Sequence, residues 1–144
     1  MALGSNAKVE LLKRAPLFSE CSKAELAALA MTADELDLRE GAVLTREGAS
    51  GREFFVLIEG TVRVTRDGRK IAELGAGDWL GEIALLTESP RTATATATTP
   101  VRILVVTDRA FRQVVEKMPS IALKVLASVA ERLGHDTELR KPTT

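Results

Sequence analysis

The segment from Gly81 to Ala93 carries the residue types that a charged, polar ligand requires. It interrupts a β-rich region with about one helical turn, which begins at Gly81. A glycine lets a backbone approach a ligand closely, and the unpaired amides of the turn that follows favour an anion. Arg91 comes back to the same neighbourhood, and its planar fork can hold two phosphate oxygens at once. The spacing therefore predicts an anion-binding site.

Glu82 adds a second requirement to this site. A carboxylate beside a phosphate is repulsive unless it accepts hydrogen bonds from a neutral group such as a sugar hydroxyl. An arginine, turn amides and a carboxylate together fit a ribose phosphate, and they indicate binding without catalysis. Taken singly, Arg91 could be one half of a surface ion pair and Glu82 an acid at a helix start, so the interpretation depends on their joint spacing around Gly81.

These residues resemble the phosphate-binding cassette of the cyclic-nucleotide-binding domain family, which protein kinase A regulatory subunits, gated channels and catabolite-activator-type regulators share. The family pattern is Phe-Gly-Glu-(Leu/Ile)-Ala-Leu followed by Pro-Arg-x-Ala, and Gly81 to Ala93 matches it with the kinase-type spacing. Leu80 stands where the family commonly has Phe. The resemblance extends over roughly Leu12 to Leu133, with turn glycines placed as in the family at the following positions: Gly48, Gly60, Gly75 and Gly77.

The resemblance implies a ligand, cAMP or cGMP, and no cofactor or metal. It implies that Glu82 binds the ribose 2′-hydroxyl, that Arg91 binds the exocyclic phosphate oxygens, and that Gly81 allows the close approach. Amides near Ala84 and Thr92 would complete the phosphate cradle. The expected ligand-binding residues are Gly81, Glu82, Ile83, Ala84, Arg91, Thr92 and Ala93.

Thr92 is relevant to which nucleobase, adenine or guanine, the ligand carries. In the family an alanine at this position goes with cAMP, whereas a threonine can offer its hydroxyl to a guanine in the syn form, although some members with threonine respond to cAMP. Because one hydroxyl contributes only about 1 kcal/mol, we expect cAMP to be preferred and leave cGMP open.

Short runs of β-forming residues punctuated by glycine surround the cassette, and they predict strands at 43–45, 53–58, 61–66, 70–74, 92–98 and 101–106. Asp67-Gly68 predicts a type I′ hairpin turn, and Ser22 with Glu25 has the spacing of a capping box. The expected fold class is α+β, mainly β: an eight-stranded antiparallel β-roll, jelly-roll-like, flanked by N-terminal and C-terminal helices.

The last helix is the expected moving part. Asp108 is a plausible N-cap for the helix before it, Pro119 fits the first turn of the last helix, and Gly134 is expected to end its regular part. An apolar stripe predicts one buried face, formed by Ile121, Val125, Leu126, Val129 and Leu133. By analogy with the family, phosphate would draw the cassette toward Arg91, Leu85 or Leu86 would shift, and the helix would close as a lid. By the same analogy, this helix could also pair two protomers as a homodimer.

The domain organisation follows from these patterns. Residues 1–7 are expected to be a disordered start or a cloning remnant, and residues 8–140 a single cyclic-nucleotide-binding domain. Within it, 8–35 is expected to be helical, 36–107 the β-roll with the cassette at 81–93, and 108–139 the helical lid.

Composition narrows the function classes. The formal net charge is zero, which predicts no binding to nucleic acid or membrane surfaces, and no apolar run is long enough to insert into a membrane. The single cysteine, Cys21, fits a reducing, cytoplasmic setting. The single histidine, His135, leaves a metal-dependent or Ser-His-Asp enzyme without its ligands or its base, so we expect no enzyme. The remaining alternative is a protein-interaction module with a vestigial nucleotide site, and a sensor would report to an effector domain or protein.

Overall fold

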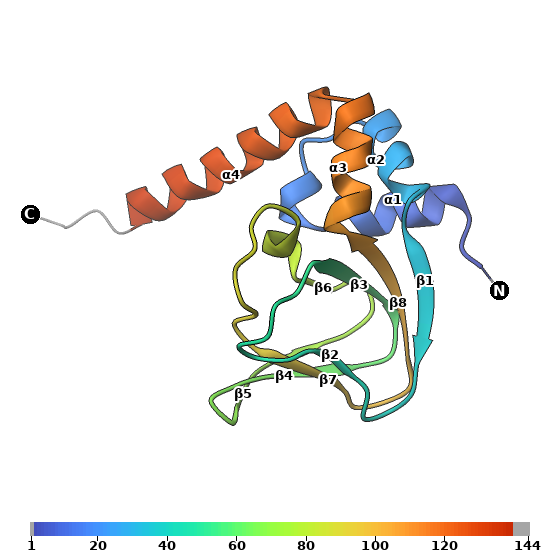
Figure 1. Cartoon of the computed structure of the whole chain (residues 1–144), viewed down its shortest axis with the longest axis vertical. Coiled ribbons are helices and arrows are strands. Elements are labelled where there is room, and N and C mark those ends of the chain that lie inside the picture. The colour runs from blue at the N-terminus through green and yellow to red at the C-terminus, as the bar shows by residue number, and fades with distance from the viewer. Residues whose placement is uncertain (1, 140–144) are drawn as a thin grey trace, which may run out of the picture.

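The computed structural model describes residues 2–139, with side chains up to residue 133. Within this range two four-stranded antiparallel sheets form a roll, and helices gather at one end of it (Figure 1). The helical elements are α1 (Ser5–Lys13), η1 (Pro16–Phe18), α2 (Lys23–Ala30), η2 (Glu82–Leu85), α3 (Asp108–Lys117) and α4 (Ser120–Leu139). The strands are β1 (Asp34–Leu38), β2 (Val43–Thr45), β3 (Glu53–Glu59), β4 (Val62–Arg66), β5 (Arg69–Leu74), β6 (Trp79–Leu80), β7 (Thr94–Ala97) and β8 (Val101–Thr107).

The strand orders are β1-β8-β3-β6 in one sheet and β2-β7-β4-β5 in the other. This architecture confirms the expected α+β class and the eight-stranded antiparallel β-roll with flanking helices. The hairpin between β4 and β5 is also confirmed, because Asp67 and Gly68 both have positive φ angles, of 52° and 78°. A type I′ turn requires that combination.

β3 is an inner strand of its sheet, and both of its faces are buried. Phe54 and Val56 belong to a core beneath the helices, whereas Phe55 and Leu57 belong to a second core inside the roll. Successive side chains of a strand point to opposite faces, so a strand between two cores must be apolar at consecutive positions. The run Phe54-Phe55-Val56-Leu57 therefore places β3 between the core beneath the helices, which form a helical cap at one end of the roll, and the core inside the roll.

The capping box at the start of α2 is confirmed. The Ser22 hydroxyl accepts from the Glu25 amide at 3.2 Å, and the Glu25 carboxylate accepts from the Ser22 amide at 2.7 Å. Glu25 also accepts a hydrogen bond from the Ser120 hydroxyl and lies 3.4 Å from Lys124 Nζ, so this buried carboxylate joins α2 to the first turn of α4. These donors, Ser120 first, lower the pKa of Glu25 from 4.5 to about 2.

Several local predictions differ from the structure. α1 begins at Ser5, inside the segment 1–7 that the sequence suggested to be a disordered start, and the Leu3 amide donates to the Glu35 carboxylate at 3.0 Å. Thr107, not Asp108, caps α3: its hydroxyl accepts from the Ala110 amide at 3.1 Å.

Asp108 is instead the first residue of α3, and its carboxylate pairs with Arg52 at 3.2 Å. α4 continues past Gly134 to Leu139, because a single helical glycine costs only about 1 kcal/mol. The side chain of His135 lies outside the described part of the chain.

The expected single stripe on α4 is wrong, because its members lie on two faces. Ile121 and Val125 are buried at 0% and 5% exposure and Val129 is partly buried, but Leu126 and Leu133 are each 62% exposed. Residues 121 and 126 are five apart, and 3.6 residues per turn place them well round the helix from each other.

We predict that Glu25→Gln destabilises the domain by about 1.5–3 kcal/mol at neutral pH, because charge-assisted hydrogen bonds at the start of α2 and at the start of α4 are weakened. The depressed pKa gives the sign of the pH effect. The ionised carboxylate stabilises the native state fully above its unfolded-state pKa of 4.5, and this stability is lost as the pH falls toward about 2. Urea unfolding measured between these pH values should therefore show a steeper loss for the parent chain than for Glu25→Gln.

The exposed Glu20 provides the matched control, and Glu20→Gln should change stability by no more than about 0.5 kcal/mol. Equal pH dependence for the parent chain and Glu25→Gln would contradict this role of Glu25.

Candidate functional site

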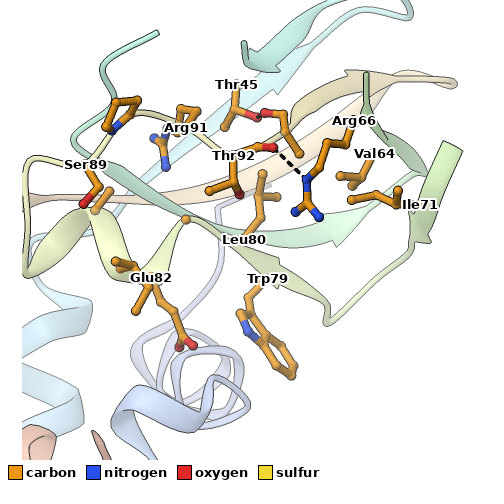
Figure 2. Close-up of a pocket in the computed structure, with 15 residues that line it drawn as sticks. Thr45, Val64, Arg66, Ile71, Trp79, Leu80, Glu82, Ser89, Arg91 and Thr92 are labelled. Atoms are coloured by element: carbon orange, nitrogen blue, oxygen red, sulfur yellow. Dashed lines mark hydrogen bonds between the residues drawn. The ribbon is translucent and has the colours of Figure 1, made fainter. Parts of the chain in front are cut away.

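A pocket of about 390 Å³ opens between the cassette and the β4–β5 hairpin (Figure 2). All seven predicted site residues line it, from Gly81 to Ala84 on one side and from Arg91 to Ala93 on the other. The remaining lining residues are Thr45, Val64, Arg66, Ile71, Trp79, Leu80, Ser89 and Pro90. Segments far apart in the sequence therefore converge on one cavity.

Gly81 shapes the cassette turn. It initiates the short helix η2 with a φ of 83°, a conformation that favours glycine. A Cβ atom at this position would lie 2.7 Å from the Glu53 carbonyl oxygen, so the space also requires glycine. The Ala84 amide donates back to the Gly81 carbonyl at 3.0 Å and closes the turn.

The guanidinium of Arg91 is buried, with 9% of the side chain exposed. Its Nη2 donates to the Glu53 carbonyl at 2.7 Å, and it lies 3.5 Å from the Glu53 carboxylate, which is itself 46% exposed. The group also lies over the Phe55 ring at 5.7 Å from its centroid. Burial lowers the pKa of Arg91 from its ordinary value, and Glu53 opposes this only in part.

A buried cation with one carbonyl and one half-exposed carboxylate is poorly compensated. An anionic ligand would supply the missing negative charge. The geometry of Arg91 therefore suits a phosphate at this end of the pocket.

Gly51 is a residue that sequence reasoning missed. A Cβ atom at Gly51 would collide with the Arg91 guanidinium. The same loop holds the Arg91 backbone, whose amide donates to the Ala49 carbonyl at 2.8 Å and whose carbonyl accepts from the Gly48 amide at 2.9 Å. The only available signal was a glycine just before the apolar run of β3, so Arg91 and Gly51 could not be paired without the fold.

Glu82 does not point its carboxylate at Arg91 or Thr92. Figure 2 shows it directed away from them. Its Oε1 accepts from Arg132 Nη1 of α4 at 2.8 Å, and its Oε2 accepts from the Leu17 amide of η1 at 3.3 Å. Both acceptor oxygens thus tie the cassette to the helices, with 12% of the side chain exposed.

The opposite end of the pocket combines apolar side chains with one arginine. Arg66 Nε donates to the Thr92 carbonyl at 2.9 Å (Figure 2), and Thr45 holds the adjacent Ala93 carbonyl at 3.0 Å. Trp79 is half-buried, packs against the core beneath the helices and also lines the pocket.

Residues 2–139 also bear on metal, membrane and thiol chemistry. No three His, Cys, Asp or Glu side chains described there are grouped to hold a metal ion. No helix in that range is both long and apolar enough to cross a bilayer. Cys21 is buried, and this burial raises the pKa of its thiol to about 11, so it is not an activated nucleophile.

Sequence comparisons agree with the geometry. Residues 35–118 match the family model described as Cyclic nucleotide-binding domain. The chain is 38% identical over 140 residues to the cAMP-dependent protein kinase regulatory subunit of Mycosarcoma maydis, covering 89% of this chain and 25% of that protein. It is 31% identical over 129 residues to the CRP-like cAMP-activated global transcriptional regulator of Mycobacterium tuberculosis (strain CDC 1551 / Oshkosh), covering 86% of this chain and 58% of that protein.

A solved structure shares the whole fold. The N-terminal domain of a transcriptional regulator from Streptomyces coelicolor A3(2) has a TM-score of 0.83 and 31% identity, over 94% of this chain and 97% of that chain. The chain spans less than two thirds of the length of the two curated relatives, 25% of the first and 58% of the second. Because the family model covers more than half of the chain, the chain belongs to the cyclic nucleotide-binding domain family.

Proposed function

We propose that this chain is a regulatory sensor domain that binds a cyclic nucleotide, preferring cAMP over cGMP, and performs no catalysis of its own. The observation that carries the proposal is the buried, poorly compensated guanidinium of Arg91 beside the glycine-initiated turn at Gly81. The names of two relatives, one cAMP-dependent and the other cAMP-activated, support cAMP as the first ligand. The free thiol of Cys21 suits action in the reducing cytoplasm.

In this proposal Arg91 binds the exocyclic phosphate and Glu82 the ribose 2′-hydroxyl. To reach a ribose, Glu82 must either turn away from Arg132 and Leu17 or share its carboxylate with them. Either change alters the contact between the cassette and α4. Ligand binding would thereby be coupled to the position of the last helix.

The packing also distinguishes the two leucines of the proposed coupling. Leu85 is 2% exposed and belongs to the core beneath the helices, where Phe111 of α3 also lies, whereas Leu86 is 37% exposed. A shift of Leu85 would disturb that core directly. We therefore assign the coupling role to Leu85, and the helices would report to an effector domain or protein.

The outward face of α4 favours a protein partner in addition to the ligand. Leu123 and Leu126 are 68% and 62% exposed, and Ala127 and Ala130 are exposed beside them. The spacing i, i+3, i+4, i+7 makes one continuous apolar stripe on the helix. A second copy of α4 presents an identical stripe, and we propose a homodimer through it.

Calorimetric titration of the chain, stripped of bound nucleotide by unfolding and refolding, tests the ligand. We expect micromolar or tighter binding of cAMP, weaker binding of cGMP and much weaker binding of 5′-AMP. Absence of binding to all three would contradict the sensor proposal and leave a vestigial pocket on a protein-interaction module.

Arg91→Lys should weaken cAMP binding by about tenfold or more, because an ammonium keeps the charge but loses the bidentate fork. Its melting temperature should stay close to that of the parent chain. Arg69→Lys in the exposed hairpin is the matched control and should bind normally. Unchanged affinity for cAMP in Arg91→Lys would show that Arg91 does not bind the phosphate.

Saturating cAMP should change amide hydrogen exchange in residues 121–133, since ligand on Glu82 alters its bond to Arg132. Arg132→Gln should bind cAMP yet show a smaller change in this segment, because the link between cassette and helix is weakened. Exchange in the parent chain that does not respond to cAMP would refute the lid mechanism.

Leu126→Glu should convert the dimer to a monomer, measured by sedimentation equilibrium at several protein concentrations. Met31, 87% exposed and distant in sequence from α4, provides the control substitution Met31→Glu, which should leave the dimer intact. A parent chain that remains monomeric over the whole concentration range would exclude this interface.

A further inference from the structure

Arg66 reaches the pocket from the end of β4. It lies on the same face of the strand as Val64, because alternate side chains point to one side, and both residues line the cavity. The hydrogen bond from Arg66 Nε to the Thr92 carbonyl, at 2.9 Å, holds the guanidinium in a defined orientation. This arginine is therefore preorganised at the pocket wall.

The two terminal nitrogens of Arg66 remain available. No carboxylate in the described part of the chain forms an ion pair with it, and Nε alone contacts Thr92. Figure 2 shows both terminal nitrogens on the pocket side, between Leu80 and Ile71. They therefore present two parallel N–H donors over an apolar part of the cavity.

That combination matches one edge of a purine. The side chains of Val64, Ile71 and Leu80 offer an apolar surface on which a flat base can lie. Guanine presents adjacent acceptors, O6 and N7, to which an arginine fork donates two hydrogen bonds. Adenine presents its N6 amino group in place of O6, so a donor would face a donor there.

We propose that Arg66 is a base-selecting residue that donates to guanine O6 and N7. It thereby strengthens the binding of cGMP and reduces the ratio by which cAMP is preferred. The inference rests on the proposed cyclic-nucleotide function and deepens it. Arg66 would be a second residue that distinguishes the two bases, beside the hydroxyl of Thr92. The two residues are adjacent, because Arg66 donates to the Thr92 carbonyl.

A general effect of charge has to be separated from base reading. A positive side chain near the pocket attracts the phosphate of either nucleotide, and loss of the bond to the Thr92 carbonyl would disturb the site for both. Such effects cancel in the ratio of the dissociation constants of cGMP and cAMP. The ratio is therefore the quantity to measure.

The test titrates cAMP and cGMP into the parent chain, Arg66→Leu, Arg66→Lys and Arg63→Leu. Arg63 is an exposed arginine of the same strand that does not line the pocket, so its substitution removes the same charge outside the site. We expect Arg66→Leu to weaken cGMP about tenfold or more and cAMP less than about threefold, as loss of a bidentate base contact predicts. Arg66→Lys should give an intermediate ratio, and Arg63→Leu should leave the ratio unchanged.

Equal losses for both nucleotides in Arg66→Leu, or a ratio that does not move, would overturn base selection by Arg66 while the sensor proposal stands. A parent chain that binds neither nucleotide would overturn the sensor proposal, and this inference with it.

Discussion

The burial of one cation, the guanidinium of Arg91, is the constraint around which the site is built. A charged group with 9% of its side chain exposed must find compensation, and the chain provides it only partly, through the backbone and carboxylate of Glu53. Two glycines, Gly51 and Gly81, leave the room in which the guanidinium lies, since a Cβ at either would meet it. The pocket is thus a place where negative charge is stabilising, and a phosphate suits it.

The doubly buried strand β3 makes this arrangement rigid. Its first residue, Glu53, anchors Arg91, and Phe55 lies beneath the guanidinium. Its alternate residues, Phe54 and Val56, pack under the helices. The Arg91 end of the pocket and the core beneath the helices therefore share one strand, and this shared strand is a physical basis for the coupling that we propose.

Glu82 adds a polar connection to this packed one. Its carboxylate, for which we propose a ribose as ligand, is held by Arg132 of α4 and by the Leu17 amide. α4 itself is attached at its start through Ser120 and Glu25. α4 is thus attached at its first turn and again at Arg132, and the pivot of this helix that we propose would act on the second attachment.

Much of this protein follows from local sequence patterns. The glycine-initiated cassette turn, the Asp67-Gly68 hairpin and the Ser22–Glu25 capping box were predictable, because each depends on backbone conformations that neighbouring residues determine. The run of four consecutive apolar residues in β3 likewise indicates that both faces of this strand are buried. The convergence of the cassette residues on a single pocket was predictable only by resemblance.

Tertiary structure alone decided which distant groups meet. Arg132 lies 50 residues from Glu82, Glu53 lies 38 residues from Arg91, and Arg66 lies 26 residues from Thr92. No local pattern encodes such pairs, because they depend on how the roll closes and on which side of α4 faces it. For the same reason the sequence assigned Leu126 to the buried stripe of α4, whereas the packing of Ile121 and Val125 against the cap turns it to solvent. The sequence by itself determined six of the eight strands and the chemistry of the cassette, and the closure of the roll determined which distant groups meet.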